Sequence, residues 1–154
     1  MSKLRFHWTD MISTFTWFLL SPNGRSSRQE FWLGYLGLIA VLGFLVRALP
    51  NLVLYKHHGR LWYRDELDLA LRWPAMTAIL IVGWPLIAVV VKRLHDLNVS
   101  GWWMVAMLAL PPLSKVTGVN PLILYLVPIV LLGLVAGTAG DNRFGSVPLA
   151  RRGT

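Results

Sequence analysis

Long apolar stretches separated by short polar segments dominate the pattern of the chain. The clearest runs from Trp73 to Val91, nineteen residues without a charge, and would form a helix of about 28 Å at 1.5 Å per residue. Such a helix nearly spans the ~30 Å hydrocarbon core of a bilayer. We therefore expect an all-α fold, a multi-pass transmembrane helical bundle forming a single membrane domain over residues 1–154. The expected spans are residues 28–50, 73–93, 99–113 and 121–139.

The third expected span is short. Fifteen residues cross a bilayer only with local thinning or with burial inside the protein. A re-entrant third segment, which gives three spans in total, is the alternative. We expect four spans, because residues 114–120 are polar enough to reach the opposite surface.

The start of the first span carries a capping box, Ser27-Arg28-Gln29-Glu30. The Ser27 side chain can accept from the N3 amide while Glu30 accepts from the amide of Ser27. We expect the helix to stop at Pro50, which would bring Arg47 to the far interface. The alternative is a helix that continues to Tyr55 and holds Arg47 inside the membrane.

Residues 8–20 predict an N-terminal amphipathic helix that lies in the membrane interface. Six apolar residues follow helical spacing, while Asp10 and Ser13 fall largely elsewhere. An ordinary helix packed on the domain is the alternative. Polar residues also interrupt the stretch after Lys3 and Arg5, so we expect no cleaved signal peptide. The apolar residues are Trp8, Met11, Ile12, Phe15, Phe18 and Leu19.

The segment 51–72 is predicted to be a polar loop with a short interfacial helix, because its acids precede Arg72 in the order that suits a helix dipole. His57-His58 and Asp65-Glu66 could suggest a metal, but their spacing matches no known ligand set, so we expect none. We likewise expect no cofactor.

Composition narrows the class of protein. Hydrophobic residues make up 55% of the chain and charged residues 14%, and the formal net charge is +8. The basic residues flank apolar spans instead of forming one face, which favours anionic lipid headgroups over nucleic acid. The chain has no cysteine, which excludes disulfides and thiolate chemistry.

The distribution of basic residues predicts the orientation. With four spans and the N-terminus inside, nine Lys and Arg residues lie on the cytoplasmic side and six on the other. This bias favours cytoplasmic termini. The cytoplasmic set is Lys3, Arg5, Arg25, Arg28, Lys92, Arg93, Arg143, Arg151 and Arg152.

Three motifs together resemble a known family. They are the ranges 23–32, 92–103 and 137–145, which read NGRSSRQEFW, KRLHDLNVSGWW and GTAGDNRFG. They are similar to the YhaH-like small bacterial inner-membrane proteins, domain of unknown function 805, over about residues 15–148. Lys92 stands where that family usually has Arg, and the stretch between the second and third motifs is longer than expected for the family. The resemblance implies an integral inner-membrane protein of unknown activity and lends no catalytic residues.

These motifs would place a polar cluster on the cytoplasmic face. In one interpretation it is structural, and Asp96 pairs with Arg93 or reaches another Arg. In another, the Arg residues hold a phosphate or lipid headgroup, and acid–base catalysis is a third. We expect a non-enzymatic membrane protein whose cluster binds lipid headgroups or a protein partner; the alternative is a small transporter or channel subunit. The cluster comprises Arg25, Arg28, Glu30, Arg93, His95, Asp96, Asp141, Asn142 and Arg143.

Overall fold

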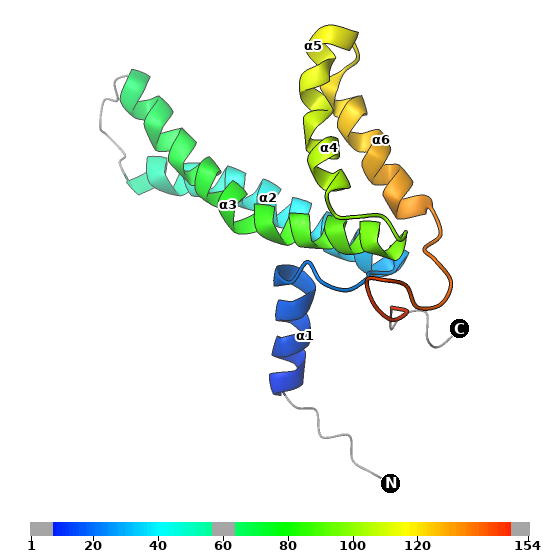
Figure 1. Ribbon diagram of the computed structural model, residues 1–154. Coiled ribbons are helices and arrows are strands. Elements are labelled where there is room, and N and C mark those ends of the chain that lie inside the picture. The colour runs from blue at the N-terminus through cyan, green and yellow to red at the C-terminus, as the bar shows by residue number, and fades with distance from the viewer. Residues whose placement is uncertain (1–7, 57–63, 149–154) are drawn as a thin grey trace.

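A computed structural model describes residues 8–56 and 64–148, and within these residues the chain is helical with no strand (Figure 1). One isolated bridge joins Asn142 and Gly145. The helices are α1 Trp8–Leu20, α2 Arg28–Lys56, α3 Arg64–Asp96, α4 Trp103–Ala109, α5 Ser114–Thr117 and α6 Pro121–Leu134, with a 3-10 turn at Pro111–Leu113.

Two of the described helices are long and apolar enough to cross a membrane. They are Arg28–Leu49 within α2 and Arg72–Asp96 within α3. Helix α6 is apolar but shorter, with 14 residues. The all-helical fold is therefore confirmed, whereas the number of spans stays a prediction.

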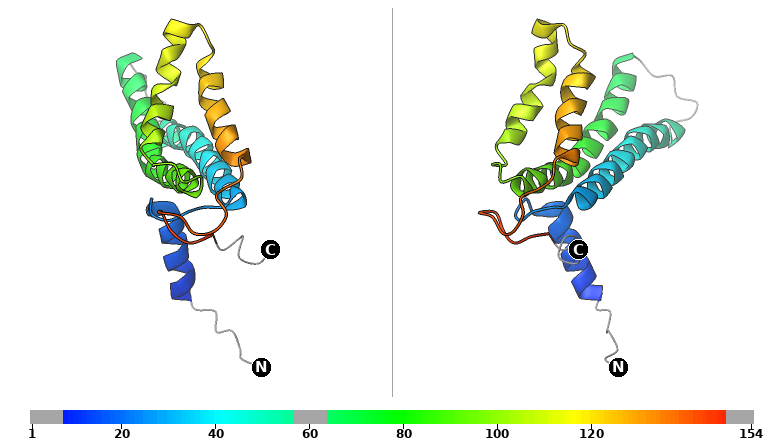
Figure 2. Two further views of the ribbon diagram at one scale, coloured as in Figure 1. Left: turned by 45° about the vertical axis from the view of Figure 1, so that its right-hand side comes forward. Right: turned by 90° about the vertical axis from the view of Figure 1, so that its right-hand side faces the viewer.

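Helices α2 to α6 form two hairpins that share a base. Helices α2 and α3 pack along each other, and α4, α5 and α6 make a second hairpin that diverges from the first (Figures 1 and 2). At the base, Phe31 and Tyr35 of α2, Val89 of α3 and Ile129 of α6 belong to one buried core. The Tyr35 hydroxyl also bonds to that of Tyr125, 2.9 Å away, which ties α2 to α6.

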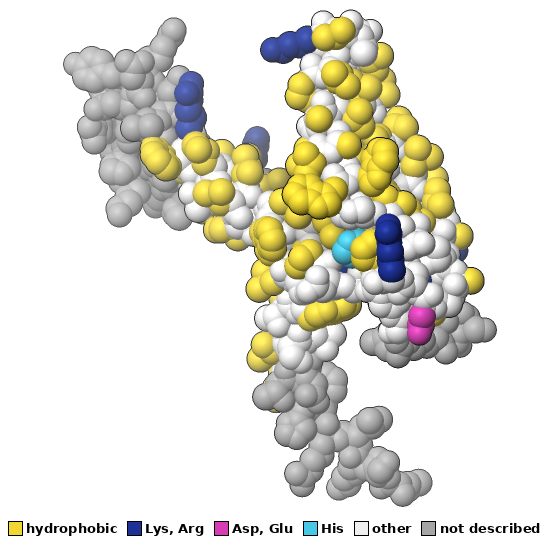
Figure 3. Space-filling model, viewed as in Figure 1, with side chains coloured by type: hydrophobic (Ala, Val, Ile, Leu, Met, Phe, Trp, Pro, Cys, Tyr) yellow, Lys and Arg dark blue, Asp and Glu magenta, His cyan; other side chains and the backbone are white. Residues whose placement is uncertain are grey.

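The outer surfaces of both hairpins are apolar. Figure 3 shows hydrophobic side chains spread over α4, α6 and the visible part of α3, with few charged groups between them. Large side chains such as Leu33, Leu80 and Val116 are more than three-quarters exposed. This is the surface expected where lipid, not water, is the neighbour.

Helix α1 leaves the base on the side away from both hairpins (Figures 1 and 2). Its last turn is held by α3: Lys92 Nζ donates to the carbonyls of Trp17 at 2.7 Å and Phe18 at 2.6 Å, and Trp84 Nε1 donates to that of Leu20 at 2.8 Å. The terminal carbonyls of a helix have no intrahelical partner, so these donors fix the end of α1 on α3. The interfacial position predicted for α1 stays a prediction.

Two predicted helix boundaries were wrong. The helix that carries the first span does not stop at Pro50 but continues to Lys56, and the segment before Trp73 is not a separate helix but the start of α3 at Arg64. A proline inside a helix removes one hydrogen bond, while each further residue adds one, and membrane helices tolerate this loss. Pro50 therefore lies inside a longer helix, as the alternative for Arg47 required, and Pro74 lies inside α3.

The second hairpin is shorter than the expected ranges 99–113 and 121–139. Helix α4 begins at Trp103, and the Pro111-Pro112 pair turns its continuation into 3-10 geometry. Helix α6 ends at Leu134, because the following residues enter an extended loop that binds the end of α3. The Val135 carbonyl accepts from Arg93 Nη2, and the Thr138 hydroxyl donates to the carbonyl of Asp96.

Candidate functional site: a polar latch at the base of the hairpins

The end of α3 is a Schellman motif. Asn98 adopts a left-handed conformation with φ of 60°. Its amide donates to the carbonyl of His95 at 3.0 Å, and the Val99 amide donates to that of Leu94 at 2.9 Å. These are the two hydrogen bonds that define the motif. The chain turns sharply here, so the carbonyls of His95 and Asp96 face the loop that follows α6.

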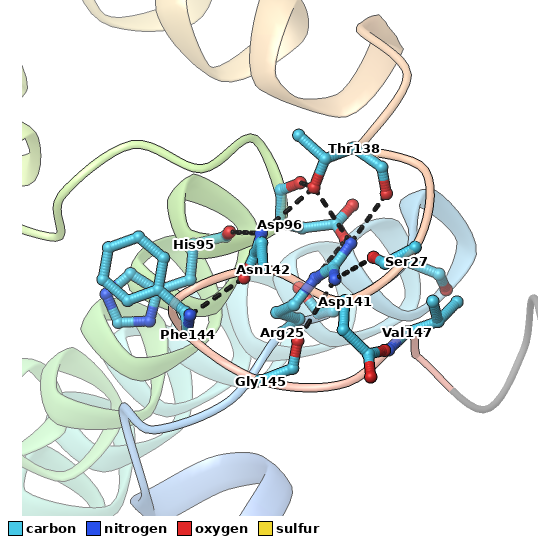
Figure 4. A network of polar contacts seen from close by, with 12 residues as sticks. Arg25, Ser27, His95, Asp96, Thr138, Asp141, Asn142, Phe144, Gly145 and Val147 are labelled. Carbon is cyan, nitrogen blue, oxygen red and sulfur yellow. Dashed lines mark hydrogen bonds and ion pairs between the residues drawn. The ribbon is translucent and has the colours of Figure 1, made fainter.

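Residues 135–148, here named the closing loop, complete the hydrogen bonds at this helix end. The Thr138 amide donates to the carbonyl of Asp96 at 2.9 Å, and the Thr138 hydroxyl donates to it at 3.0 Å. The Asn142 Nδ2 donates to the carbonyl of His95 at 2.9 Å and to the Thr138 hydroxyl at 3.0 Å (Figure 4). The second and third sequence motifs are therefore partners in one hydrogen-bonded unit.

Arg25 joins the first motif to the other two. Its Nε and Nη2 donate to Asp96 Oδ1 at 3.1 and 3.0 Å, and both side chains are fully buried. Nη1 donates to the carbonyls of Gly140 at 2.6 Å and Gly145 at 3.3 Å, while Nη2 also reaches the carbonyl of Thr138 at 2.8 Å. All five N–H donors of the guanidinium can be satisfied by these acceptors.

Arg93 occupies the other side of Asp96. Its Nη1 donates to Asp96 Oδ2 at 2.5 Å and to the carbonyl of Ser26 at 3.2 Å. Nε donates to the carbonyl of Leu132 at 2.8 Å, and Nη2 donates to that of Val135. A guanidinium at the C-terminal carbonyls of α6 is also favoured by the helix dipole.

We call Arg25, Arg93, Asp96, Thr138 and Asn142 the polar latch. One carboxylate serves two buried guanidiniums, and the remaining donors are directed at backbone carbonyls. A buried charge is tolerated only when it is paired and fully hydrogen-bonded, and here it is. The latch fastens the start of α2, the end of α3 and the end of α6 together, so its guanidiniums are occupied by the protein itself.

The predicted capping box is confirmed. The Ser27 amide donates to Glu30 Oε2 at 2.7 Å, and the Glu30 amide donates to Ser27 Oγ at 3.2 Å. Helix α2 begins at the next residue, Arg28. In the described part of the chain Glu30 makes no ion pair with Arg, since its carboxylate caps the helix.

The remaining cluster residues lie around the latch. His95 stacks on Phe144 with ring centroids 3.9 Å apart, and Arg143 Cζ lies 4.6 Å from the centroid of the same Phe144 ring. Arg143 Nη2 also donates to the carbonyl of Asn98 at 3.1 Å. The exposed Asp141 accepts from the Val147 amide at 3.0 Å. Arg28 is exposed beside the latch at the start of α2.

The structure thus brings the nine predicted residues to one end of the molecule, but in different roles. Arg25, Arg93 and Asp96 are buried, whereas Arg28, Asp141 and Arg143 are exposed. Thr138 and Lys92 were missing from the predicted set although both stand inside the motifs. Within residues 8–56 and 64–148, no group of three or more His, Asp or Glu could hold a metal. His57 and His58 lie outside the described residues.

The comparison with known families matches the motifs seen in the sequence. The family described as "Protein of unknown function (DUF805)" matches residues 19–146. The chain belongs to this family. The match contains all three motifs, so the family resemblance read from them is confirmed.

Two relatives of the DUF805 chain come from Escherichia coli (strain K12). Inner membrane protein YhaI is 27% identical over 126 residues, which cover 82% of this chain and 84% of the relative. Uncharacterized protein YiiR is 29% identical over 140 residues, which cover 82% and 85%. No solved structure matches. With two helices of membrane length, these findings agree with the membrane protein expected from the sequence.

Proposed function

We propose that the chain is a non-enzymatic integral protein of the bacterial inner membrane, that it crosses the bilayer four times, and that its cytoplasmic face binds anionic lipid headgroups. The observation that carries this proposal is the position of the polar latch. It lies where two hairpins with apolar outer surfaces meet, as a membrane-boundary site would. The location agrees with the name of the relative YhaI, an inner membrane protein.

The latch also supports four crossings over three. Thr138 binds the end of α3, so in a membrane the closing loop would lie on the side where α3 ends. The segment between Asp96 and Thr138 would then have to leave this side and return to it, and the hairpin of α4 and α6 is consistent with such a path. A single crossing after a re-entrant segment would place the closing loop on the opposite side. The bias of nine basic residues against six favours the cytoplasm for this shared side.

Lipid headgroups are proposed as the ligand because of the basic groups that remain accessible. Arg25 and Arg93 are buried in the latch, and their N–H groups donate to acceptors of the protein itself. Arg28 and Arg143 are exposed on the same end of the molecule. Each basic group at the surface of an anionic leaflet contributes about 1 kcal/mol of attraction. Asp96 is committed to two guanidiniums, so we assign it no catalytic role.

The orientation can be tested with single cysteines, because the chain has none. Val116→Cys lies in α5 at the far end of the second hairpin, and Ala139→Cys lies exposed in the closing loop. In intact spheroplasts a membrane-impermeant maleimide should label Val116→Cys, and it should label Ala139→Cys only after lysis. Protection of Val116→Cys together with labelling of Ala139→Cys in intact spheroplasts would contradict the proposed topology, and equal accessibility of the two residues would contradict a crossing between them.

Lipid selectivity can be tested on purified protein equilibrated with equal amounts of phosphatidylglycerol and phosphatidylcholine. We expect retained lipid to be enriched in phosphatidylglycerol by about fivefold, the factor that one surface arginine supplies. The double variant Arg28→Gln with Arg143→Gln should remove the enrichment. The matched control is Arg47→Gln, which removes an exposed arginine of α2 away from the latch. Equal retention of both lipids by the wild-type protein would overturn headgroup binding.

A further inference from the structure

An apolar groove runs along the base of the molecule between the start of α2 and the end of α6. Its volume is about 550 Å³, within the ~300–1,000 Å³ of ordinary ligand sites. Trp32, Leu33 and Leu134 form apolar walls, and Arg28 and Gln29 form the polar end. The groove thus has a polar end and an apolar length, which complement the polar head and apolar chain of an amphiphile.

Close packing of the two helices shapes the floor of the groove. Gly133 of α6 lies directly under the Trp32 indole, and a Cβ at this position would come within 2.2 Å of the ring. A small residue lets the ring rest against the helix backbone. Leu33 and Leu134 also line the groove, with 77% and 62% of their surfaces exposed.

Arg28 differs from the other arginines of the predicted cluster. Arg25 and Arg93 are buried in the polar latch, and Arg143 lies on Phe144 and donates to a carbonyl. Arg28 is exposed, and in the described part of the chain it has no hydrogen-bond acceptor or ion pair. It therefore keeps a guanidinium fork available for a phosphate.

At the polar end of the groove, the group that would attract an anion is the Arg28 guanidinium and not the N-terminus of α2. The Glu30 carboxylate already caps the start of α2 by accepting from the Ser27 amide. No acidic side chain lines the groove itself. Arg28 is also the first residue of the membrane-length segment Arg28–Leu49, so it would stand at headgroup level while Leu33 lies deeper.

We infer that this groove holds one anionic glycerophospholipid, with its phosphate on Arg28 and one acyl chain along Trp32, Leu33 and Leu134. Gln29 can donate a hydrogen bond to the phosphate or ester oxygens. The occupant is a lipid of the surrounding leaflet, because a charged end at the boundary and an apolar length along the span complement it. This inference rests on the proposed function, which sets the depth of Arg28.

Single-cysteine variants make the site measurable. Leu36→Cys lies one helical turn after Trp32, is 56% exposed and does not line the groove, so it can carry a fluorophore beside the site. The labelled protein is placed in bilayers of phosphatidylglycerol and phosphatidylcholine, in which one of the two lipids at a time has brominated acyl chains. The dependence of quenching on mole fraction gives the relative association constant of the two lipids at the probe. We expect phosphatidylglycerol to be favoured about fivefold at this position. The constant should fall to about one in Leu36→Cys with Arg28→Gln.

Two controls separate the groove from a general preference for anionic lipid. Phe44→Cys is on the same helix, 69% exposed and outside the groove, and should report no preference. Leu36→Cys with Arg47→Gln, which removes an exposed arginine of the same helix outside the groove, should keep its preference. Equal association constants at both probe positions, or an unchanged constant after Arg28→Gln, would overturn the inference that the groove holds the lipid. In that case, enrichment of phosphatidylglycerol by the purified protein would still support the proposed function. No enrichment in either experiment would overturn both.

Discussion

Replacing Asp96 with alanine should lower the free energy of unfolding by about 3–5 kcal/mol, the usual cost of removing one partner of a buried ion pair. Asp96 is fully buried and accepts from Arg25 at 3.0 Å and Arg93 at 2.5 Å. Without it, two guanidiniums share a closed site with no carboxylate. Unfolding by a denaturing detergent, followed by near-ultraviolet circular dichroism, would measure the loss.

A double-mutant cycle distinguishes this ionic role from loss of side-chain volume. Arg93→Ala with Asp96→Ala should cost less than the sum of the single changes, because it removes one charge of each sign. The matched control is Asp141→Ala, which removes an exposed acid of the closing loop whose partner is one amide. Strict additivity of the two latch changes, or an equal loss in the control, would contradict the paired arrangement.

Replacing Lys92 with methionine should lower the free energy of unfolding by about 2–3 kcal/mol and loosen α1 from α3. Lys92 is fully buried, and its ammonium donates to two carbonyls at the end of α1 and lies 4.2 Å from the centroid of a Trp17 ring. Hydrogen bonds to charged groups contribute about 1.5–3 kcal/mol each, and the packing of methionine retains part of the contact. The measurement is detergent unfolding together with the rate of proteolysis within residues 21–24.

The control for Lys92 is Trp84→Phe, which removes only the neutral bond to the carbonyl of Leu20. It should cost about 1 kcal/mol and leave residues 21–24 protected. If Lys92→Met and Trp84→Phe behave alike in both measurements, the end of α1 is not held by the ammonium.

Local signals in the sequence predicted local structure. The capping box fixed the start of α2 because its two hydrogen bonds join residues only three apart. The mean apolarity of membrane-length stretches indicated α2 and α3, because this signal also comes from residues that are neighbours in the sequence. Helix ends marked by proline alone were misjudged, since one lost hydrogen bond does not outweigh the helical residues on both sides of Pro50 and Pro74.

Long-range partners could be predicted only as a group. The three motifs each carry polar residues at an expected boundary, which indicated a shared cluster. The sequence could not show that Asp96 would serve Arg25 and Arg93 together, because that depends on how α2 crosses α3. Thr138 and Lys92 were missed for a related reason. Both side chains donate to backbone carbonyls, which every residue has and no motif marks.

The polar latch also imposes an order on biosynthesis. Arg25 donates to Gly140 and Gly145, which follow it by 115 and 120 residues. At about 5–20 residues per second, the ribosome needs on the order of ten seconds to supply those acceptors. Until then Arg25 and Arg93 share the single carboxylate of Asp96, and only water can accept from their remaining N–H donors. A chain that ends before the closing loop would keep these groups hydrated and without their protein partners. Cellular proteases could therefore distinguish such a truncated chain from a complete one.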